Sequence, residues 1–185
     1  MSAEKFKRLG VEVLRRCDSQ APSSISTSKP LNSSTIEIAN RQRTRKINSR
    51  SLKKNVGELF AELKIAEAEL GIHLVGAKEM AAVNWKFLRH EGSTDVITFD
   101  HLNSKLKIKN SKLHGELFVC VDDAVKQAKE FGTTWQSEIT RYIVHGVLHL
   151  RGYDDLKPQL RRVMKREENR LVRLLEKNFP SAGHD

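Results

Sequence analysis

Apolar residues recur along this chain in short segments, and their spacing predicts an alternation of strands and helices. Residues 35–39 alternate between polar and apolar side chains, as a half-buried strand does. Over residues 51–70 the apolar side chains instead keep a helical period, at Val56, Leu59, Phe60, Leu63 and Ala66. We expect this helix to stop at Gly71 and a short strand to follow at 72–75.

The middle of the chain continues this alternation. A helix is predicted at 77–88, because Met80, Val83 and Phe87 lie at helical spacing. Two segments rich in β-branched and aromatic residues, 93–100 and 115–121, are predicted strands. The lysine-bearing residues 102–113 between them predict either a solvated loop or an RNA contact.

Three helices are predicted in the last third of the chain. The first covers 122–131 and is ended by Gly132. Thr133 or Thr134 is expected to cap the second, with Gln136 as a capping-box partner. The third covers residues 158–177, and its apolar residues are Leu160, Val163, Met164, Leu171, Leu174 and Leu175.

Two histidines and a glycine after them carry the clearest chemical signal. His145 and His149 lie four residues apart, so on a helix both imidazoles share one face and can bind one ion. Such pairs are also common on surfaces and in cores. Gly152 favours the left-handed conformation that ends a helix, after which Asp155 can return to the same point. Three protein ligands and one open position are typical of catalytic zinc, so we predict one Zn²⁺ per chain on His145, His149 and Asp155.

The charge distribution predicts that the chain binds a phosphate-rich partner. The 185 residues carry a formal charge of +10, and residues 1–57 hold 13 Lys and Arg against 4 Asp and Glu. A basic front fits such a partner, although a solubilising tail is the alternative. No apolar run reaches the roughly 18 residues of a membrane span. Cys17 and Cys120 are far apart, which fits a reducing cytoplasm.

Residues 1–33 are predicted to be a basic, Ser-rich, disordered arm outside the fold. Residues 1–17 also have the spacing of a short amphipathic helix, and residues 18–34 resemble a linker. Glu4, Glu12 and Asp18 argue against an organelle transit peptide, which is poor in acidic residues. We therefore expect a domain at 34–178 and a flexible tail at 179–185.

The segment HGVLHLRGYDD at 145–155 resembles the signature HGxLHLxGYDH of the YbeY family of metal-dependent endoribonucleases. Asp155 stands where the family has a third histidine. Three further segments resemble family motifs: STDVITF is similar to PTDVLSF, VNWKFLRHEG to LNxxYRxKD, and GEL to GDI. The resemblance covers about residues 35–175. It implies an α+β fold, a small mixed β-sheet surrounded by helices, with the metal site on a helix and the turn after it.

The same resemblance implies residues that act beside the metal. The family's functional arginine falls at Leu88, and Arg89 and Lys86 stand close to that position. We predict that Arg89 and Lys86 are catalytic residues whose positive charges stabilise the negative charge on the phosphate. Together with Thr94 and Asp95 of the STDV segment, they are also the predicted substrate-binding residues.

Three functions are compatible with these sequence features. The first is a single-strand-specific endoribonuclease that uses a zinc-activated water; by resemblance, it acts in maturation of small-subunit ribosomal RNA and in ribosome quality control, on pre-ribosomal particles in the cytoplasm. The second is a zinc metallopeptidase, which needs a general-base glutamate where this chain has Gly146. The third is a non-catalytic, RNA-binding ribosome-assembly factor, which the loss of the third histidine would fit.

Overall fold

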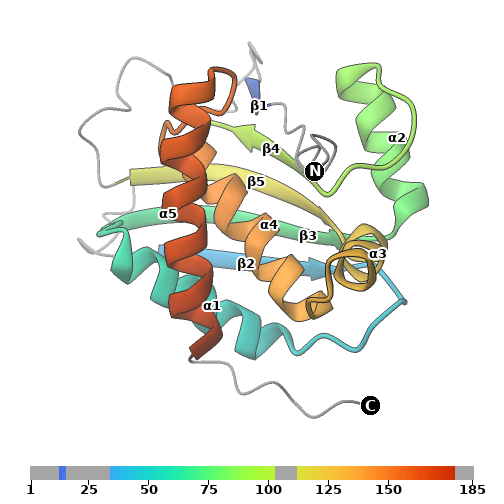
Figure 1. The fold of residues 1–185 in the computed structure, drawn as a ribbon, viewed down its shortest axis with the longest axis horizontal. Helices are drawn as coiled ribbons and strands as arrows, with labels where there is room; N and C mark the ends of the chain where they lie inside the picture. The colour runs from blue at the N-terminus through green and yellow to red at the C-terminus, as the bar shows by residue number, and fades with distance from the viewer. Residues whose placement is uncertain (1–12, 16–33, 103–111, 178–185) are drawn as a thin grey trace, which may run out of the picture.

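A five-stranded mixed β-sheet forms the centre of the computed structural model, which describes residues 13–15, 34–102 and 112–177. The strands are β1 (Val13–Arg15), β2 (Ser34–Asn40), β3 (Glu67–Val75), β4 (Val96–Asp100) and β5 (Lys112–Cys120). Their order across the sheet is β1-β4-β5-β3-β2. Only β4 and β5 pair antiparallel; the other neighbours are parallel (Figure 1).

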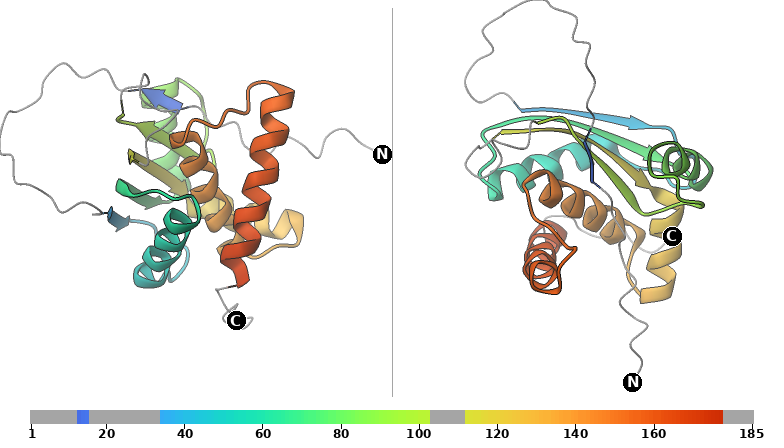
Figure 2. Two further views of the ribbon diagram at one scale, coloured as in Figure 1. Left: turned by 90° about the vertical axis from the view of Figure 1, so that its left-hand side faces the viewer. Right: turned by 90° about the horizontal axis from the view of Figure 1, so that it is seen from above.

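Three helices cover one face of this sheet in two layers, and another packs on the opposite face. The helices are α1 (Ser49–Glu62), α2 (Ala77–Leu88), α3 (Val121–Phe131), α4 (Trp135–Leu150) and α5 (Pro158–Lys177). The right-hand view of Figure 2 shows α1, α4 and α5 below the sheet. Helix α4 packs on β4 and β5, and α5 packs on α4 and α1. The predicted α+β fold is therefore confirmed.

Helix α4 is buried along most of its length because it lies between the sheet and α5. Gly146 lies where α4 contacts the sheet. A Cβ atom there would come within 2.5 Å of Leu117 Cδ2 and 3.0 Å of Thr98 Oγ1. The absence of a side chain at Gly146 thus sets the close approach of α4, and with it the position of His145 one residue earlier.

A second, smaller apolar cluster lies under α2. It contains Met80 of α2 together with Ile97 and Phe99 of β4, and the rings of Phe87 and Phe99 meet edge to face with centroids 4.9 Å apart. This packing fixes α2 against the sheet. The bounds of α2 and of α5 are the ones that the apolar spacing predicts.

The helix predicted at 51–70 is too long, and this is the main error of the sequence analysis. Helix α1 ends at Glu62, Lys64 takes a left-handed φ of 53°, and residues 67–70 belong to β3. The apolar side chains of β3 also alternate with a period of two, and β3 pairs with β2 on one side and β5 on the other. Gly71 lies inside this strand instead of ending a helix.

Smaller differences concern element ends. Strand β4 begins at Val96 instead of 93, and β5 begins at Lys112, so it takes two residues from the predicted loop. Loop residues 103–111 lie outside the described residues. The cap of α4 is Thr134, whose Oγ1 accepts a 3.2 Å hydrogen bond from the Ser137 backbone N–H, so the capping box with Gln136 is wrong.

The predicted arm is described only at Val13–Arg15. These residues form β1, which pairs parallel with β4 at Thr98–Asp100. The amphipathic helix expected over 1–17 is therefore wrong at this segment, because the backbone joins the sheet. The remainder of 1–33 and the tail 179–185 lie outside the described residues, so the division into arm, domain and tail stays a prediction. Within the described part, no helix is both long and apolar enough to cross a membrane.

Candidate metal centre

The two imidazoles of α4 face each other at the buried end of the helix. His145 and His149 are 3% and 5% exposed, and their Nε2 atoms lie 3.0 Å apart. One helical turn separates them, so their side chains leave the backbone in the same direction. The i, i+4 spacing read from the sequence thus brings both rings together, as predicted.

The turn after α4 returns a carboxylate to this pair. Gly152 has φ of 88°, its N–H donates to His149 O at 2.9 Å, and the Tyr153 N–H donates to Leu148 O at 3.0 Å. This is the Schellman arrangement, in which a left-handed glycine ends the helix. Asp155 Oδ1 then lies 3.9 Å from His149 Nε2, and the ligand atoms of His145, His149 and Asp155 all lie within 4.8 Å of one another.

The neighbouring carboxylate has a different role. Asp154 Oδ1 accepts the Leu156 backbone N–H at 2.9 Å, which closes the turn before α5. The side chain of Asp155 instead lies toward the histidines, and its backbone oxygen accepts from Arg161 Nε at 2.9 Å. Among the two acids of the turn, Asp155 is therefore the candidate ligand.

Hydrogen bonds fix which ring nitrogens are available to a metal. His149 Nδ1 lies 3.1 Å from Tyr153 O, and a carbonyl oxygen only accepts, so Nδ1 carries the proton. His145 Nδ1 lies 3.0 Å from Glu168 Oε2 and likewise donates to it. Both Nε2 atoms then present lone pairs toward one point. Two lone pairs and a carboxylate that converge in this way fit a divalent cation.

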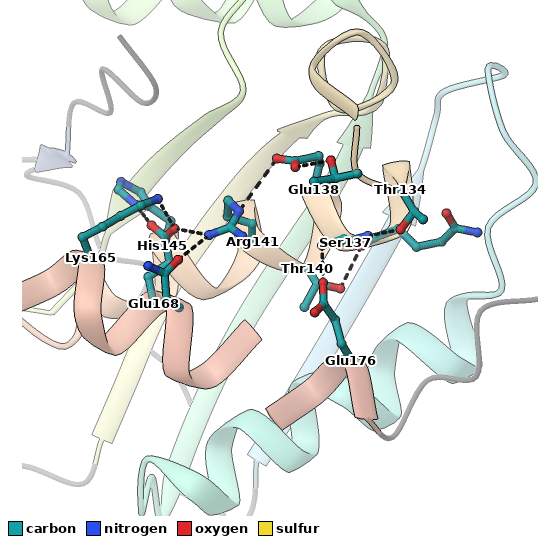
Figure 3. Close-up of polar contacts among 12 residues, drawn as sticks. Thr134, Ser137, Glu138, Thr140, Arg141, His145, Lys165, Glu168 and Glu176 are labelled. Carbon is teal, nitrogen blue, oxygen red and sulfur yellow. Dashed lines mark hydrogen bonds and ion pairs between the residues drawn. The ribbon is translucent and has the colours of Figure 1, made fainter. Parts of the chain in front are cut away.

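Glu168 is held as an anion in the core behind His145. It is 1% exposed, and burial raises its pKa, but hydrogen bonds from His145 and Lys165 and the Lys165 charge outweigh this and lower the pKa to about 2. Arg141 Nη1 also donates to Glu168 Oε1 at 2.7 Å. Figure 3 shows Glu168 between these three side chains. A permanent carboxylate therefore orients the His145 ring.

This network continues toward the start of α4. Arg141 Nε lies 3.8 Å from Glu138 Oε2, and Glu138 Oε1 accepts from Thr133 Oγ1 at 2.6 Å. Sequence reasoning did not identify Glu168. The sequence feature that points to Glu168 is its position among the buried apolar residues of α5, which include Met164, Leu171 and Leu175.

His149 is kept neutral by its surroundings. Burial and the neighbouring His145 lower its pKa to about 4, while Asp155 and the Tyr153 carbonyl act in the opposite direction. Neutral imidazole is the form that binds metal, so His149 is ready to act as a ligand at neutral pH.

Thr94 and Asp95 lie in the turn before β4. Asp95 is 4% exposed, and its Oδ1 accepts from Thr94 Oγ1 at 3.0 Å and from the Val96 N–H at 2.9 Å. Burial raises its pKa, and the two hydrogen bonds act against this rise. Asn84 holds the preceding loop through a 2.9 Å hydrogen bond to Gly92 O.

Lys86 and Arg89 project from the exposed end of α2. Lys86 Nζ lies 5.1 Å from the Phe87 ring centroid, and Arg89 Cζ lies 5.9 Å from that of Trp85. Arg89 is the left-handed cap of α2, with φ of 58°. A regular helix turns by about 100° per residue, so Arg89 can replace an arginine expected at position 88 only where the helix is irregular. The left-handed conformation of Arg89 is such an irregularity. Neither ring contact joins these bases to the histidines, so their catalytic role stays a prediction.

Fold and site together define an α+β protein with a two-histidine, one-carboxylate candidate metal centre. The family model "Endoribonuclease YbeY" matches residues 37–176. Among curated relatives, an "Endoribonuclease YbeY" of Chlorobium phaeovibrioides is 31% identical over 76% of this chain and 90% of that protein. Another, of Geobacter metallireducens, is 28% identical over 77% of this chain and 96% of that protein. This chain therefore belongs to the YbeY endoribonuclease family.

A solved structure agrees at the level of the fold. The solution structure of TM1509 from Thermotoga maritima matches with a TM-score of 0.54 and 22% identity, over 82% of this chain and 100% of that one. At this identity the likeness concerns the architecture alone.

Proposed function

We propose that this protein is a zinc-dependent endoribonuclease that cleaves single-stranded RNA. We further propose that it acts in the cytoplasm on pre-ribosomal particles, in maturation of small-subunit ribosomal RNA and ribosome quality control. The observation that carries the proposal is the convergence of His145, His149 and Asp155 in a chain of the YbeY family. The partners of both Nδ1 atoms support it, because metal-bound histidines usually donate their second ring N–H to a carboxylate or a carbonyl in this way.

Each residue has a definite part in this proposal. When bound, the metal supplies a water of lowered pKa and polarises a phosphoryl oxygen. His145, His149 and Asp155 hold it, while Glu168 and the Tyr153 carbonyl keep the two rings oriented. Lys86 and Arg89 bind the phosphate and stabilise charge that develops on it. Thr94 and Asp95 position the RNA beside the centre.

The packing of Gly146 argues against the metallopeptidase. That chemistry needs a glutamate directly after the first histidine. Any side chain at this position would collide with Leu117 and Thr98, since a Cβ atom alone comes within 2.5 Å of Leu117 Cδ2. This chain therefore lacks both the general-base glutamate of such a peptidase and the room for its side chain.

Metal content and RNA cleavage, measured on the same samples, test the proposal. We expect one zinc per chain and weak, metal-dependent cleavage of single-stranded RNA. Cleavage is weak because an anionic ligand makes the metal a poorer acid than three imidazoles would. Chelator-treated protein and His145→Ala should be inactive. Equal cleavage by all three samples would reveal a contaminating nuclease, and metal-loaded protein that binds RNA without cutting it would support the assembly factor.

A further inference from the structure

The loop between β2 and α1 carries the densest positive charge in the described chain. Residues 41–54, which cover this loop and the start of α1, contain seven basic residues, Arg41, Arg43, Arg45, Lys46, Arg50, Lys53 and Lys54. No acidic residue occurs between Glu37 and Glu58. Arg41 pairs with Glu79 at 2.7 Å, and the charges nearest the loop tip, Arg43, Arg45 and Lys46, are exposed.

These three side chains surround a hollow in the surface. The hollow has a volume of about 820 Å³ and is lined by loop residues 40 and 43–48. Ile47 is the one apolar residue of that lining, and it is half-buried against the core. The charged and amide side chains of this lining therefore offer cations and hydrogen-bonding groups to a ligand.

The loop is held rigid by one buried amide. Gln42 is 8% exposed, and its Nε2 donates to Asn40 Oδ1 at 3.0 Å and to Arg45 O at 2.7 Å. Its Oε1 accepts the backbone N–H groups of Thr44 at 2.7 Å and Arg45 at 2.9 Å. One side chain thus satisfies four partners of the loop and fixes its shape before any ligand binds.

Two further contacts tie the loop to the sheet and to α3. The backbone N–H groups of Arg41 and Gln42 both donate to Leu74 O, at 2.9 Å and 3.2 Å. The Thr44 hydroxyl donates to Asp122, which also accepts the Ala77 N–H at 2.7 Å. Binding a ligand here therefore costs little ordering entropy of the backbone, which is the advantage of a pre-organised loop.

We propose that this loop is a second RNA contact, which binds the phosphate backbone of the substrate away from the point of cleavage. This inference rests on the proposed function. Figure 1 shows the loop at the end of the sheet opposite the turn after α4. In Figure 3 it passes beyond Thr134, whereas His145 lies at the other end of α4. His145 lies eleven residues after Thr134, which is about 16 Å along the axis of α4.

The chemistry of the loop favours RNA over an acidic protein segment. Exposed cations and amides recognise phosphates, and such contacts position a nucleic acid without reading its bases. A protein partner would need an apolar anchor in the middle of the interface, and the one apolar residue that lines the hollow, Ile47, packs against the core instead. The loop should thus strengthen binding of long RNA of any sequence, with no effect on the reaction at the metal.

The test removes the three charges of the hollow together, as Arg43→Gln, Arg45→Gln and Lys46→Gln. Affinity is measured on full-length, metal-loaded protein with a nuclease-resistant 2′-O-methyl RNA of roughly 16 nucleotides, the upper length that single-strand-binding modules contact. We expect affinity to fall on the order of tenfold and the logarithmic salt slope to become shallower by about 2, since each lost phosphate contact contributes about 0.7. Cleavage of a dinucleotide, which cannot reach both sites, should be unchanged.

A matched variant controls for net charge. Arg162→Gln, Arg166→Gln and Arg173→Gln remove the same charge from exposed positions of α5. An equal loss of affinity in both variants would overturn the inference, because it would show a general electrostatic effect. Unchanged affinity in the loop variant would also overturn it. Both outcomes are measured as RNA affinity, so they can be distinguished from a failure of the protein to cleave RNA.

Discussion

Two groups that are not metal ligands decide which nitrogens of the candidate centre are available. Glu168 and the Tyr153 carbonyl each accept the Nδ1 proton of one histidine, which leaves both Nε2 atoms free for a metal. The sequence shows the candidate ligands because they lie within one helix and one turn. It does not show Glu168, which comes from α5, 23 residues after His145, and joins it only through tertiary packing.

The role of Glu168 leads to a first prediction. Glu168→Gln keeps the shape of the side chain but removes its charge, so zinc affinity should fall about 10- to 100-fold, as for other partners of metal-bound histidines. Competition with a chromophoric chelator measures this affinity. Glu167→Gln, which alters the exposed contact with Arg170, is the matched control and should bind zinc like the unaltered protein. Equal affinity in both variants would contradict the role of Glu168.

The second prediction separates the two acids of the turn. Asp155→Ala removes a ligand and should lose most of the bound zinc, whereas Asp154→Ala removes only a turn hydrogen bond and should retain it. Asp155→His should bind zinc at least as tightly, because imidazole is an equally suitable ligand. Elemental analysis of protein purified without added metal checks all three. The reverse result for the two alanine variants would identify Asp154 as the ligand.

At the scale of elements, the sequence predicts well where the apolar period is unambiguous. The bounds of α2 and α5 come directly from it. The segment 63–70 fails because its apolar residues fit a helix and a strand equally, and strand pairing on both sides of β3 decides the outcome. The glycine that often marks the end of a helix is also missing, since the left-handed residue after α1 is Lys64.

The third prediction concerns the contact between α4 and the sheet. Gly146→Ala places a methyl group 2.5 Å from Leu117 Cδ2, so either α4 or the buried Leu117 side chain must move, at a cost of about 1–3 kcal/mol in the free energy of unfolding. Gly57→Ala in α1 has no atom within 4 Å of the new methyl group and should instead stabilise the protein by about 0.5–1 kcal/mol. Urea denaturation gives both values. A neutral Gly146→Ala would mean that the helix does not sit this close.

At the scale of the whole molecule, acid should destabilise the metal-free protein in two stages. His149 has a folded pKa of about 4 against an ordinary value of 6.5, so between these pH values the unfolded state binds more protons. Stability therefore falls as pH drops through this window, by at most about 3 kcal/mol. Glu168, with a pKa of about 2 against 4.5, extends the loss below pH 4.5.

Chemical denaturation at a series of pH values measures this dependence. His149→Asn cannot titrate, so its stability should change less between pH 6.5 and 4 than that of the unaltered protein. A metal-free protein that became more stable on acidification across this range would contradict the assignment of a neutral, buried His149.

The pairing of Val13–Arg15 with β4 has a consequence for solubility. β1 is the outermost strand on its side of the sheet, and all five residues of β4 are buried. Removing β1 would turn β4 into a bare apolar edge, and such edges recruit strands from other molecules. A protein lacking residues 1–33 should therefore aggregate at concentrations where one lacking only 1–12 stays monomeric, as light scattering can show. Equal behaviour of the two would mean that β4 needs no cover.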